Sequence, residues 1–241
     1  MKYVKNFETI SERTAVLSNA DDDILHYTDE DDKAGVYEYD PFNGHDYVDL
    51  GVTYNGNKLL FAKCNVGAST ETGYGNYYAW GETTTKSDYS WSTYIFNPSG
   101  DGTTFTKYNS TDQKVILDPE DDPVCVNMGG QWRSPIDAEL TALLNQTTNT
   151  MVSNYNGSGV NGRVFTGTNG NTMFVPAAGK LSGTYVSDVG SNAHWWSNSL
   201  YGVGSVSGRR LYFNNSSSIC GVYNDNRYYG FAARGVVSVE N

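Results

Sequence analysis

The chain has 241 residues, a formal net charge of −11 and only 18% charged residues, whereas glycine (26) and tyrosine (19) are abundant. No apolar run is long enough to cross a membrane and no basic face would attract phosphate backbones, so neither membrane insertion nor nucleic-acid binding is expected. Abundant glycine and sparse charge argue against helix bundles and favour a turn-rich fold of short strands.

The first 46 residues differ in composition from the rest and are expected to form a small appended module for attachment or oligomerisation. Thr9 and Glu12 have capping-box spacing, which predicts a short helix over residues 10–18. The acidic clusters at residues 21–23 and 29–32 lack the alternating pattern of a calcium loop and are interpreted as solvated surface, with a structural Ca²⁺ left open. Short strands are expected at Ile24–Tyr27 and Val36–Tyr39.

Neither a secretory signal nor a metal or cofactor site is expected from the sequence. The N-terminus has no apolar stretch, cleavage site or early cysteine. Cys64, Cys125 and Cys220 are odd in number and far apart, which argues against a disulfide framework and a zinc site. His26, His45 and His194 are also widely separated and lack the spacing of metal ligands.

The main domain is expected over residues 47–241, with an α+β fold. Tyr47–Gly51 and Lys58–Ala62 look like two strands joined through the turn at Asn55-Gly56, and residues 67–110 look like ordered loops and short strands. Ser134 and Pro135 predict the start of a helix that runs to about Asn145. Further short strands are expected at Arg163–Thr166, Thr172–Pro176, Trp195–Ser199, Arg209–Asn214, Ser218–Tyr223 and Phe231–Val239.

No catalytic constellation stands out, so the chain is not expected to be an enzyme. Gly157–Gly162 matches the spacing of a dinucleotide-binding loop, but a strand-like segment follows it where a pyrophosphate site needs a helix N-terminus. The motif is therefore interpreted as a turn.

Residues 197–230 have an unusual composition, because 22 of these 34 residues are Tyr, Ser, Gly or Asn. Antibody loops use this mix at their binding surfaces, where tyrosine gives contact area at low entropic cost. The segment also contains no Lys, Glu, Gln, Met or Trp. These types make up 30 of the 241 residues, so about four would be expected in 34. They are also the five types that randomising an AAY asparagine codon cannot produce. A strand-and-turn region without any binding role is the alternative.

An ordered series of motifs runs through about residues 46–240. The motifs are YVDLG (47–51), CNVGA (64–68), YGNYYAWGE (74–82), GGQWRSP (129–135), EL (139–140), FVPAAG (174–179), WSNS (196–199) and YYGFAAR (228–234). This series resembles that of the gut-bacterial and phage proteins with a C-type lectin fold, related to the "major paralogous domain" group and to the formylglycine-generating-enzyme fold. The sequence departs from the family at Phe61, where a tryptophan is usual, and at Arg234-Gly235, where Arg-Pro is common.

Many members of this family are variable proteins of diversity-generating retroelements, in which a reverse transcriptase mutagenises the adenines of a template copy. The resemblance therefore implies a C-type lectin-like domain with a variable, ligand-binding C-terminal face. No calcium motif of the sugar-binding lectins is present, so calcium-dependent sugar binding is not implied.

Alternation along the C-terminal strands divides this segment into candidate ligand-binding and scaffold positions. Leu211 and Phe213 are expected in the core, whereas Arg227, Gly230, Phe231 and Arg234 are expected to be scaffold. The expected ligand-binding residues are Tyr201, Val203, Ser205, Ser207, Arg210, Tyr212, Asn214, Val222, Tyr223, Asn224, Asp225, Tyr228 and Tyr229.

The expected function is non-catalytic binding of a bacterial surface receptor, protein or glycan, by a phage or prophage tail protein. The expected location is the virion tail or, alternatively, the bacterial cell surface, and residues 1–46 would attach the domain to a tail fibre or a second copy. Two alternatives stay open: an undiversified surface adhesin and, with less support, a formylglycine-generating-type oxidase that uses reactive cysteines.

Overall fold

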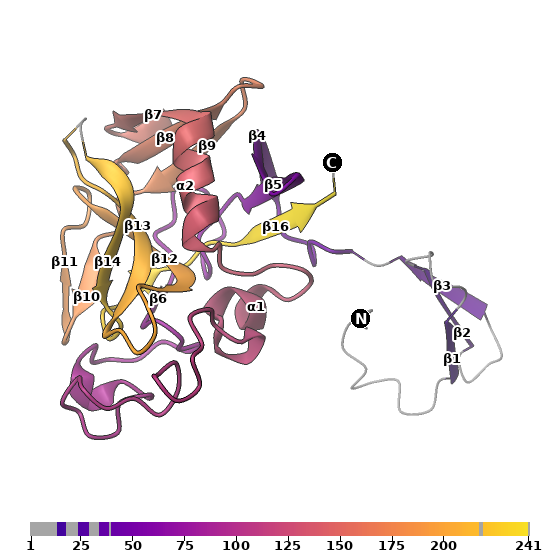
Figure 1. Ribbon diagram of the computed structural model, residues 1–241. Coiled ribbons are helices and arrows are strands. Elements are labelled where there is room, and N and C mark those ends of the chain that lie inside the picture. The colour runs from indigo at the N-terminus through magenta and orange to yellow at the C-terminus, as the bar shows by residue number, and fades with distance from the viewer. Residues whose placement is uncertain (1–13, 18–23, 29–33, 39, 217–218, 241) are drawn as a thin grey trace.

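A computed structural model describes residues 14–17, 24–28, 34–38, 40–216 and 219–240 (Figure 1). These residues form an α+β fold of short strands with few helices, as the sequence predicts. Among them, the helices are α1 (Pro123–Met128) and α2 (Asp137–Gln146), with 3-10 turns η1 (Trp91–Thr93), η2 (Pro119–Asp121) and η3 (Tyr155–Gly157). The strands are β1 (Thr14–Leu17), β2 (Ile24–Thr28), β3 (Ala34–Glu38), β4 (Tyr47–Tyr54), β5 (Asn57–Ala62), β6 (Tyr77–Tyr78), β7 (Thr147–Val152), β8 (Gly162–Gly167), β9 (Thr172–Pro176), β10 (Lys180–Ser182), β11 (Tyr185–Ser187), β12 (Ala193–Leu200), β13 (Ser207–Phe213), β14 (Cys220–Asn226), β15 (Phe231–Ala232) and β16 (Val236–Val239).

The N-terminal strands β1, β2 and β3 form an antiparallel sheet of their own. The expected helix over residues 10–18 is wrong where the structure describes it, because Thr14–Leu17 is a strand. Pairing with β2 and the β-branched residues of this segment favour the strand over the local capping signal. Thr9, Glu12, Tyr39 and both acidic clusters lie outside the described residues.

Both ends of the main domain meet in one sheet, of order β16-β5-β4. The predicted hairpin is confirmed: Asn55 and Gly56 connect β4 to β5 with φ of 51° and 84°, which a type I′ turn requires. Phe61 is fully buried and packs edge-on against Trp195, with ring centroids 6.3 Å apart. The expected strand Phe231–Val239 is divided into β15 and β16.

A five-stranded sheet of order β14-β13-β12-β15-β6 carries most of the C-terminal segment. Trp195, Leu211 and Phe213 point from it into the main core, where Leu140 and Leu143 of α2 are also fully buried. Helix α2 contacts β4, β7 and the β12–β14 strands, so it lies at the centre of the main domain (Figure 1).

The predicted helix is confirmed as α2, but it begins at Asp137 and its expected cap is wrong. The Ser134 hydroxyl donates to Asp122 at 2.7 Å and does not cap this helix. Glu139 takes the capping role, since its Oε2 accepts from the backbone N–H of Ile136 at 2.9 Å. Asp122 also accepts from the N–H of Val124, which makes it the N-cap of α1, a helix that the sequence did not predict.

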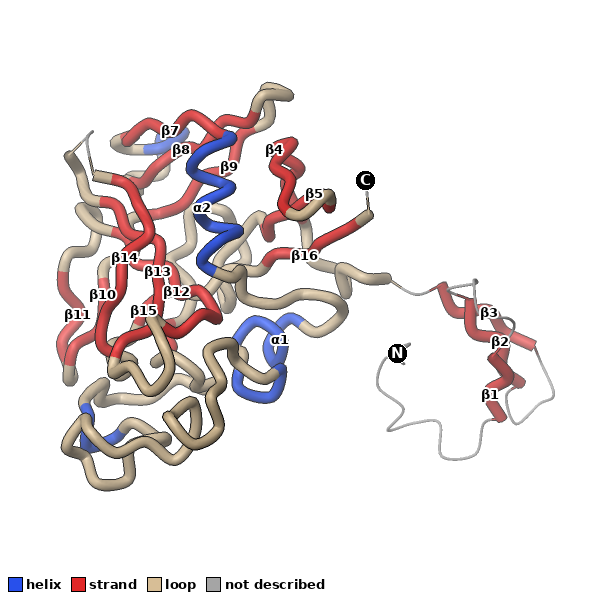
Figure 2. Tube along the Cα trace, viewed as in Figure 1, coloured by secondary structure: helices blue, strands red, loops and turns tan. Residues whose placement is uncertain are grey.

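Long loops pack around a second core on the other side of the sheet. The structure describes all of residues 63–118, and β6 and η1 are their only regular elements, as the sequence predicts (Figure 2). Their rings, among them Trp80, Tyr94 and Tyr108, are buried together with Trp196 and Phe231 of the sheet. The loops have few strand-to-strand hydrogen bonds, so the burial of these aromatic rings holds them in place.

Arg227 links three segments of this second core and is fully buried, as its expected scaffold role requires. Its Nη2 donates to the carbonyl oxygens of Tyr108, at 2.8 Å, and Ser205. The guanidinium also lies 4.1 Å from the centroid of the Phe105 ring. The other scaffold residues, Gly230, Phe231 and Arg234, are likewise buried.

Replacing Arg227 with methionine is expected to lower the free energy of unfolding by about 2–3 kcal/mol, because two buried carbonyl groups would lose a charged donor. Urea denaturation measures the change. Arg209→Met is the matched control, since Arg209 is partly exposed and lies 3.6 Å from Asp137, a surface pair that contributes at most about 1 kcal/mol. Equal losses in the two variants would contradict the anchoring role of Arg227.

Candidate functional site

The sheet strands β12–β14 present two faces, and alternation assigns their side chains to one or the other. The inner face, on the side of α2, carries Trp195 and Leu211, which enter the main core. The opposite side is called the outer face. Cross-strand pairs place His194 opposite Tyr212 and Arg210 opposite Tyr223, so these four side chains share the outer face.

Arg210 and Asp225 form an ion pair on the outer face. Asp225 Oδ2 lies 3.2 Å from Nε and 3.1 Å from Nη2 of Arg210. Burial lowers the pKa of Arg210, and the Asp225 carboxylate opposes this effect. The pair therefore holds a charged donor at a fixed position on the outer face.

Aromatic rings surround this ion pair. The Arg210 guanidinium lies 4.6 Å from the centroid of the Tyr212 ring and 5.5 Å from that of Phe231. The rings of Tyr212 and Tyr223 meet edge-on at 5.7 Å. Tyr223 is 44% exposed, so the outer face has a solvent-accessible aromatic ring next to the Arg210–Asp225 ion pair.

A second aromatic group lies where the chain leaves β14. Tyr228 and Tyr229 contact each other at 4.4 Å, and Lys180 lies 5.0 Å above the Tyr229 ring. A hydrogen bond with Tyr228, together with burial, raises the pKa of Tyr229 to about 12. Its hydroxyl is therefore protonated at neutral pH and is engaged with Tyr228.

The connection between β12 and β13 forms an exposed loop. Tyr201 and Val203 are exposed, and the ring of Tyr201 lies 4.6 Å from the guanidinium of Arg209. Strand alternation was expected over residues 201–207, but β13 begins only at Ser207. Ser205 serves the loop instead: its hydroxyl oxygen accepts from the N–H of Ser207 and its carbonyl from Arg227.

Three of the thirteen predicted positions are buried or packed against the main core, in contrast to the expected exposure. Arg210 points outward, but the rings around it leave it only 8% exposed, and Ser207 is also 8% exposed. Val222 packs against the main core, because it pairs with Leu211 and cross-strand partners share a face.

The other predicted positions lie at the surface but not all on one face. Asn224 is exposed and pairs with Arg209, which places it on the side of α2. Tyr212, Asp225, Tyr228 and Tyr229 are half-buried around the outer face. Asn214 is half-buried beyond the end of β13, where its side chain accepts from the N–H of Ser216 at 3.0 Å. The outer face thus brings together Arg210, Tyr212, Tyr223, Asp225, Tyr228 and Tyr229.

Sequence reasoning missed His194 and Lys180 as parts of this surface. His194 is buried between Tyr212 and Phe231, with ring centroids 5.0 and 4.5 Å away. Neither imidazole nitrogen has a hydrogen-bond partner among the described residues. Burial, with the charges of Arg210 and Lys180, lowers the pKa of His194 to about 3. Alternation with the core residue Trp195 was the signal that could have placed it here.

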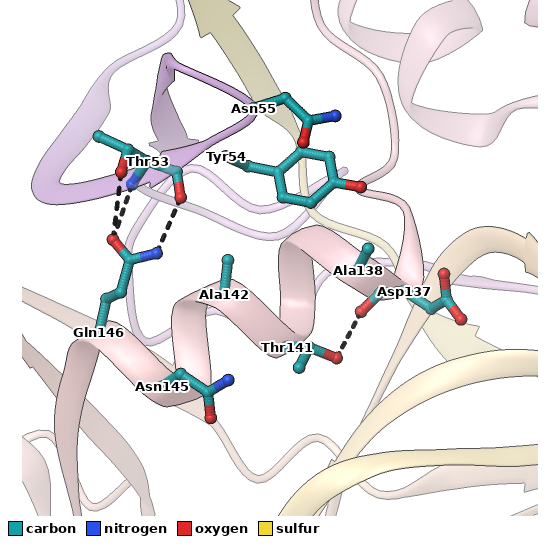
Figure 3. Close-up of a pocket in the computed structure, with 9 residues that line it drawn as sticks. All are labelled: Thr53, Tyr54, Asn55, Asp137, Ala138, Thr141, Ala142, Asn145 and Gln146. Atoms are coloured by element: carbon teal, nitrogen blue, oxygen red, sulfur yellow. Dashed lines mark hydrogen bonds between the residues drawn. The ribbon is translucent and has the colours of Figure 1, made fainter.

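Two hollows lie elsewhere on the domain. An open groove of about 560 Å³ runs between α2 and the β4–β5 hairpin, lined mainly by short polar side chains (Figure 3). Its Gln146 amide is already used, because it accepts from the N–H of Thr53 at 3.0 Å and donates to its carbonyl at 2.8 Å. Asp137 is the only carboxylate in its lining, so the groove lacks the paired groups of acid–base catalysis.

The second hollow, of about 360 Å³, includes Cys64 in its lining. Burial raises the pKa of Cys64 and of Cys220, and burial next to Asp122 raises that of Cys125 to about 12. All three cysteines are free and are therefore protonated at neutral pH. The thiolate that cysteine chemistry needs is disfavoured at each of them.

An acidic cluster of Asp118, Glu120 and Asp121 is the one group among the described residues with the spacing of a metal site. The ammonium of Lys107 lies among these carboxylates, 2.8 Å from Asp118 and 3.3 Å from Glu120, and also contacts Asp121. Although burial opposes the charge, hydrogen bonds with Asp118 and Asp121 raise the pKa of Lys107. Lys107 thus already supplies a cation to this cluster.

The glycine motif at residues 157–162 leads directly into β8, as the turn interpretation predicts.

No family model, curated protein or solved structure matches this chain. In the part of the chain that the structure describes, no helix has the length and apolarity to span a membrane.

The buried His194 is expected to make stability sensitive to acid. Its pKa in the folded protein, about 3, lies below the ordinary value of 6.5, so the unfolded chain binds a proton that the folded protein excludes. The free energy of unfolding should therefore fall from about pH 6.5 towards pH 3, by at most about 1.4 kcal/mol per pH unit from this group.

His194→Phe should remove this part of the acid sensitivity, which urea denaturation between pH 7 and 4 measures as the difference from wild type. His45→Gln, at an exposed position, is the control and should keep the wild-type dependence. A difference between wild type and His194→Phe that does not change with pH would contradict the buried, neutral imidazole.

Proposed function

We propose that this chain is a non-catalytic ligand-binding protein with a C-type lectin-like domain whose C-terminal face is diversified by a retroelement. The observation that carries the proposal is the composition of residues 197–230. They are rich in Tyr, Ser, Gly and Asn and lack the five residue types that AAY codons cannot reach. The ordered family motifs over residues 46–240 add independent support.

The arrangement of buried and exposed residues supports this proposal. Tyr201, Val203 and Tyr223 are exposed, whereas the scaffold residues Arg227 and Phe231, which follow them in the chain, are fully buried. Exposed side chains can change without disturbing a core, so such a surface tolerates substitution. Tyrosine contact area over a fixed guanidinium is also the chemistry that binding hot spots use.

The proposed ligand is a receptor on a bacterial surface, and the proposed protein is a phage or prophage tail component. Residues 1–46 would attach the domain to a tail fibre or to a second copy. A protein of the bacterial cell surface is the alternative location. The raised thiol pKa values weigh against the formylglycine-generating alternative, because that chemistry needs a reactive cysteine.

The coding DNA tests the diversification directly. A near-copy of the 3′ coding end beside a reverse-transcriptase gene is expected, with template adenines at the codons of Tyr212, Tyr223, Tyr228 and Tyr229. Codons of the buried scaffold residues Arg227 and Phe231 serve as the internal control and should match the template. A gene without such a copy would contradict diversification and favour the undiversified adhesin.

Binding is tested with fluorescently labelled protein on a panel of intact bacterial strains, measured by flow cytometry. The wild type should bind some strains, and Tyr212→Ala combined with Tyr223→Ala should weaken that binding at least about tenfold, since buried aromatic anchors dominate interfaces. Tyr47→Ala is the matched control, because Tyr47 is 45% exposed, close to the 44% of Tyr223, but lies in the terminal sheet. Unchanged binding by the double variant would contradict the proposed face.

A further inference from the structure

Strand β14 is the outermost strand of the five-stranded sheet, and only one of its edges is paired. Its seven residues pair with β13 in an unbroken register, from Ser207↔Asn226 to Phe213↔Cys220. No described strand pairs with its other edge. Residues 217 and 218, beside its start, lie outside the described residues.

The hydrogen bonds of β13 identify which groups of β14 face this open edge. The carbonyl of Ser207 accepts from Tyr201 and that of Arg209 accepts from Ser197, so odd-numbered residues of β13 direct their backbone groups towards β12. Even-numbered residues therefore face β14, where their partners are the odd-numbered residues Gly221, Tyr223 and Asp225.

The backbone N–H and C=O groups of Cys220, Val222 and Asn224 consequently point away from the sheet. Hydrogen bonds at both ends agree with this alternation, because Arg227 donates to Val206 and Asn214 donates to Ile219. Three donors and three acceptors thus stand along about 13 Å of strand, at the ordinary rise of about 3.3 Å per residue. Of these residues, Cys220 and Val222 are half-buried and Asn224 is exposed.

This edge lacks the features that natural proteins use to block strand addition. It contains neither proline nor lysine, and its register with β13 has no bulge. Asp225, its single charged residue, is engaged by Arg210 on the outer face. An unbroken edge whose single charged residue is already paired is a template for another extended chain.

We propose that β14 binds an extended polypeptide segment of the ligand as an added strand, which makes the ligand a protein and not a glycan. This inference rests on the proposed function, since the same strand carries Tyr223 of the outer face. Another peptide backbone is the partner that matches these donors and acceptors, because its own N–H and C=O groups have the same spacing. Every second side chain of the added strand would point towards the outer face, where Tyr223 and Tyr212 lie.

This arrangement separates affinity from specificity. Backbone groups are present whatever side chains β14 carries, so their hydrogen bonds survive diversification. Specificity would come from the outer-face side chains that the alternate residues of the peptide meet. A second copy of the chain is a poorer occupant, because two seven-residue edges bury only about 500 Å² in total, well below the about 1,200 Å² of stable interfaces.

The experiment uses peptides selected from a displayed random 12-residue library on the immobilised full chain, then synthesised and titrated by calorimetry. Asn224→Pro removes one outward N–H while leaving the ladder to β13 intact, because proline is tolerated at the open side of an edge strand. Asn224→Ala removes the side chain and keeps the N–H, which makes it the matched control. Proline should weaken binding about tenfold, and alanine less than about threefold.

A second measurement protects the test against misfolding of the proline variant. Single N-methyl groups along the bound peptide should weaken its binding to wild type at alternate positions only, as an added strand requires. Failure to select any peptide, equal binding by both Asn224 variants, or a free dimer whose β14 amides are protected from exchange would overturn the proposal. Loss of binding in the Tyr212/Tyr223 variant with no effect of Asn224→Pro would overturn strand addition while leaving the proposed function standing.

Discussion

The buried guanidinium of Arg227 makes the contacts on which the rest of the main domain depends. Its Nη2 joins the carbonyls of Tyr108 and Ser205, which belong to a long loop and to the β12–β13 loop. Its own backbone continues the connection, since its N–H donates to Val206 and its carbonyl accepts from Trp80. One residue therefore fixes three segments that have almost no regular secondary structure to hold them.

Arg234 plays a corresponding part at the junction of the two sheets. It is fully buried, its Nε donates to Asn65 at 2.8 Å and its Nη1 donates to the carbonyl of Phe174 at 2.9 Å. Burial lowers its pKa to about 10, so it stays charged at neutral pH. If the guanidinium were removed, the buried carbonyl groups that it pairs with would have no donor, which costs free energy. This cost favours the one arrangement of the long loops in which these hydrogen bonds form.

Local signals in the sequence predicted much of the frame. The Asn55-Gly56 turn, α2 and β9 are set by short-range chemistry: a left-handed turn, apolar spacing and a β-rich segment. The cap of α2 was misassigned because Asp122, twelve residues away, takes the Ser134 hydroxyl. Helix α1 was missed because its six residues are too few to show an apolar periodicity.

The outer face was predictable only in part, because the face on which a residue lies depends on its cross-strand partner. Alternation within β13 correctly placed Leu211 and Phe213 in the core. It could not show that Val222 pairs with Leu211 and so shares its face. Nor could it show that the rings of Tyr212 and Phe231 would cover Arg210, since Phe231 approaches from a different strand.

The Arg210–Asp225 pair sets a limit on how freely the outer face can vary. Asp225 is the acid partner of Arg210, which is 8% exposed, so changing Asp225 alone would leave a buried guanidinium without its counter-charge. Changing Arg210 alone would free a carboxylate at the surface, where water can solvate it at little cost. The two positions therefore differ in their tolerance to substitution, because Asp225 can change only together with Arg210. Tyr223 can change alone, since it is exposed and contacts the ion pair only through its ring. If the outer face is diversified as proposed, substitutions that respect this order would preserve the sheet while they change the proposed ligand surface.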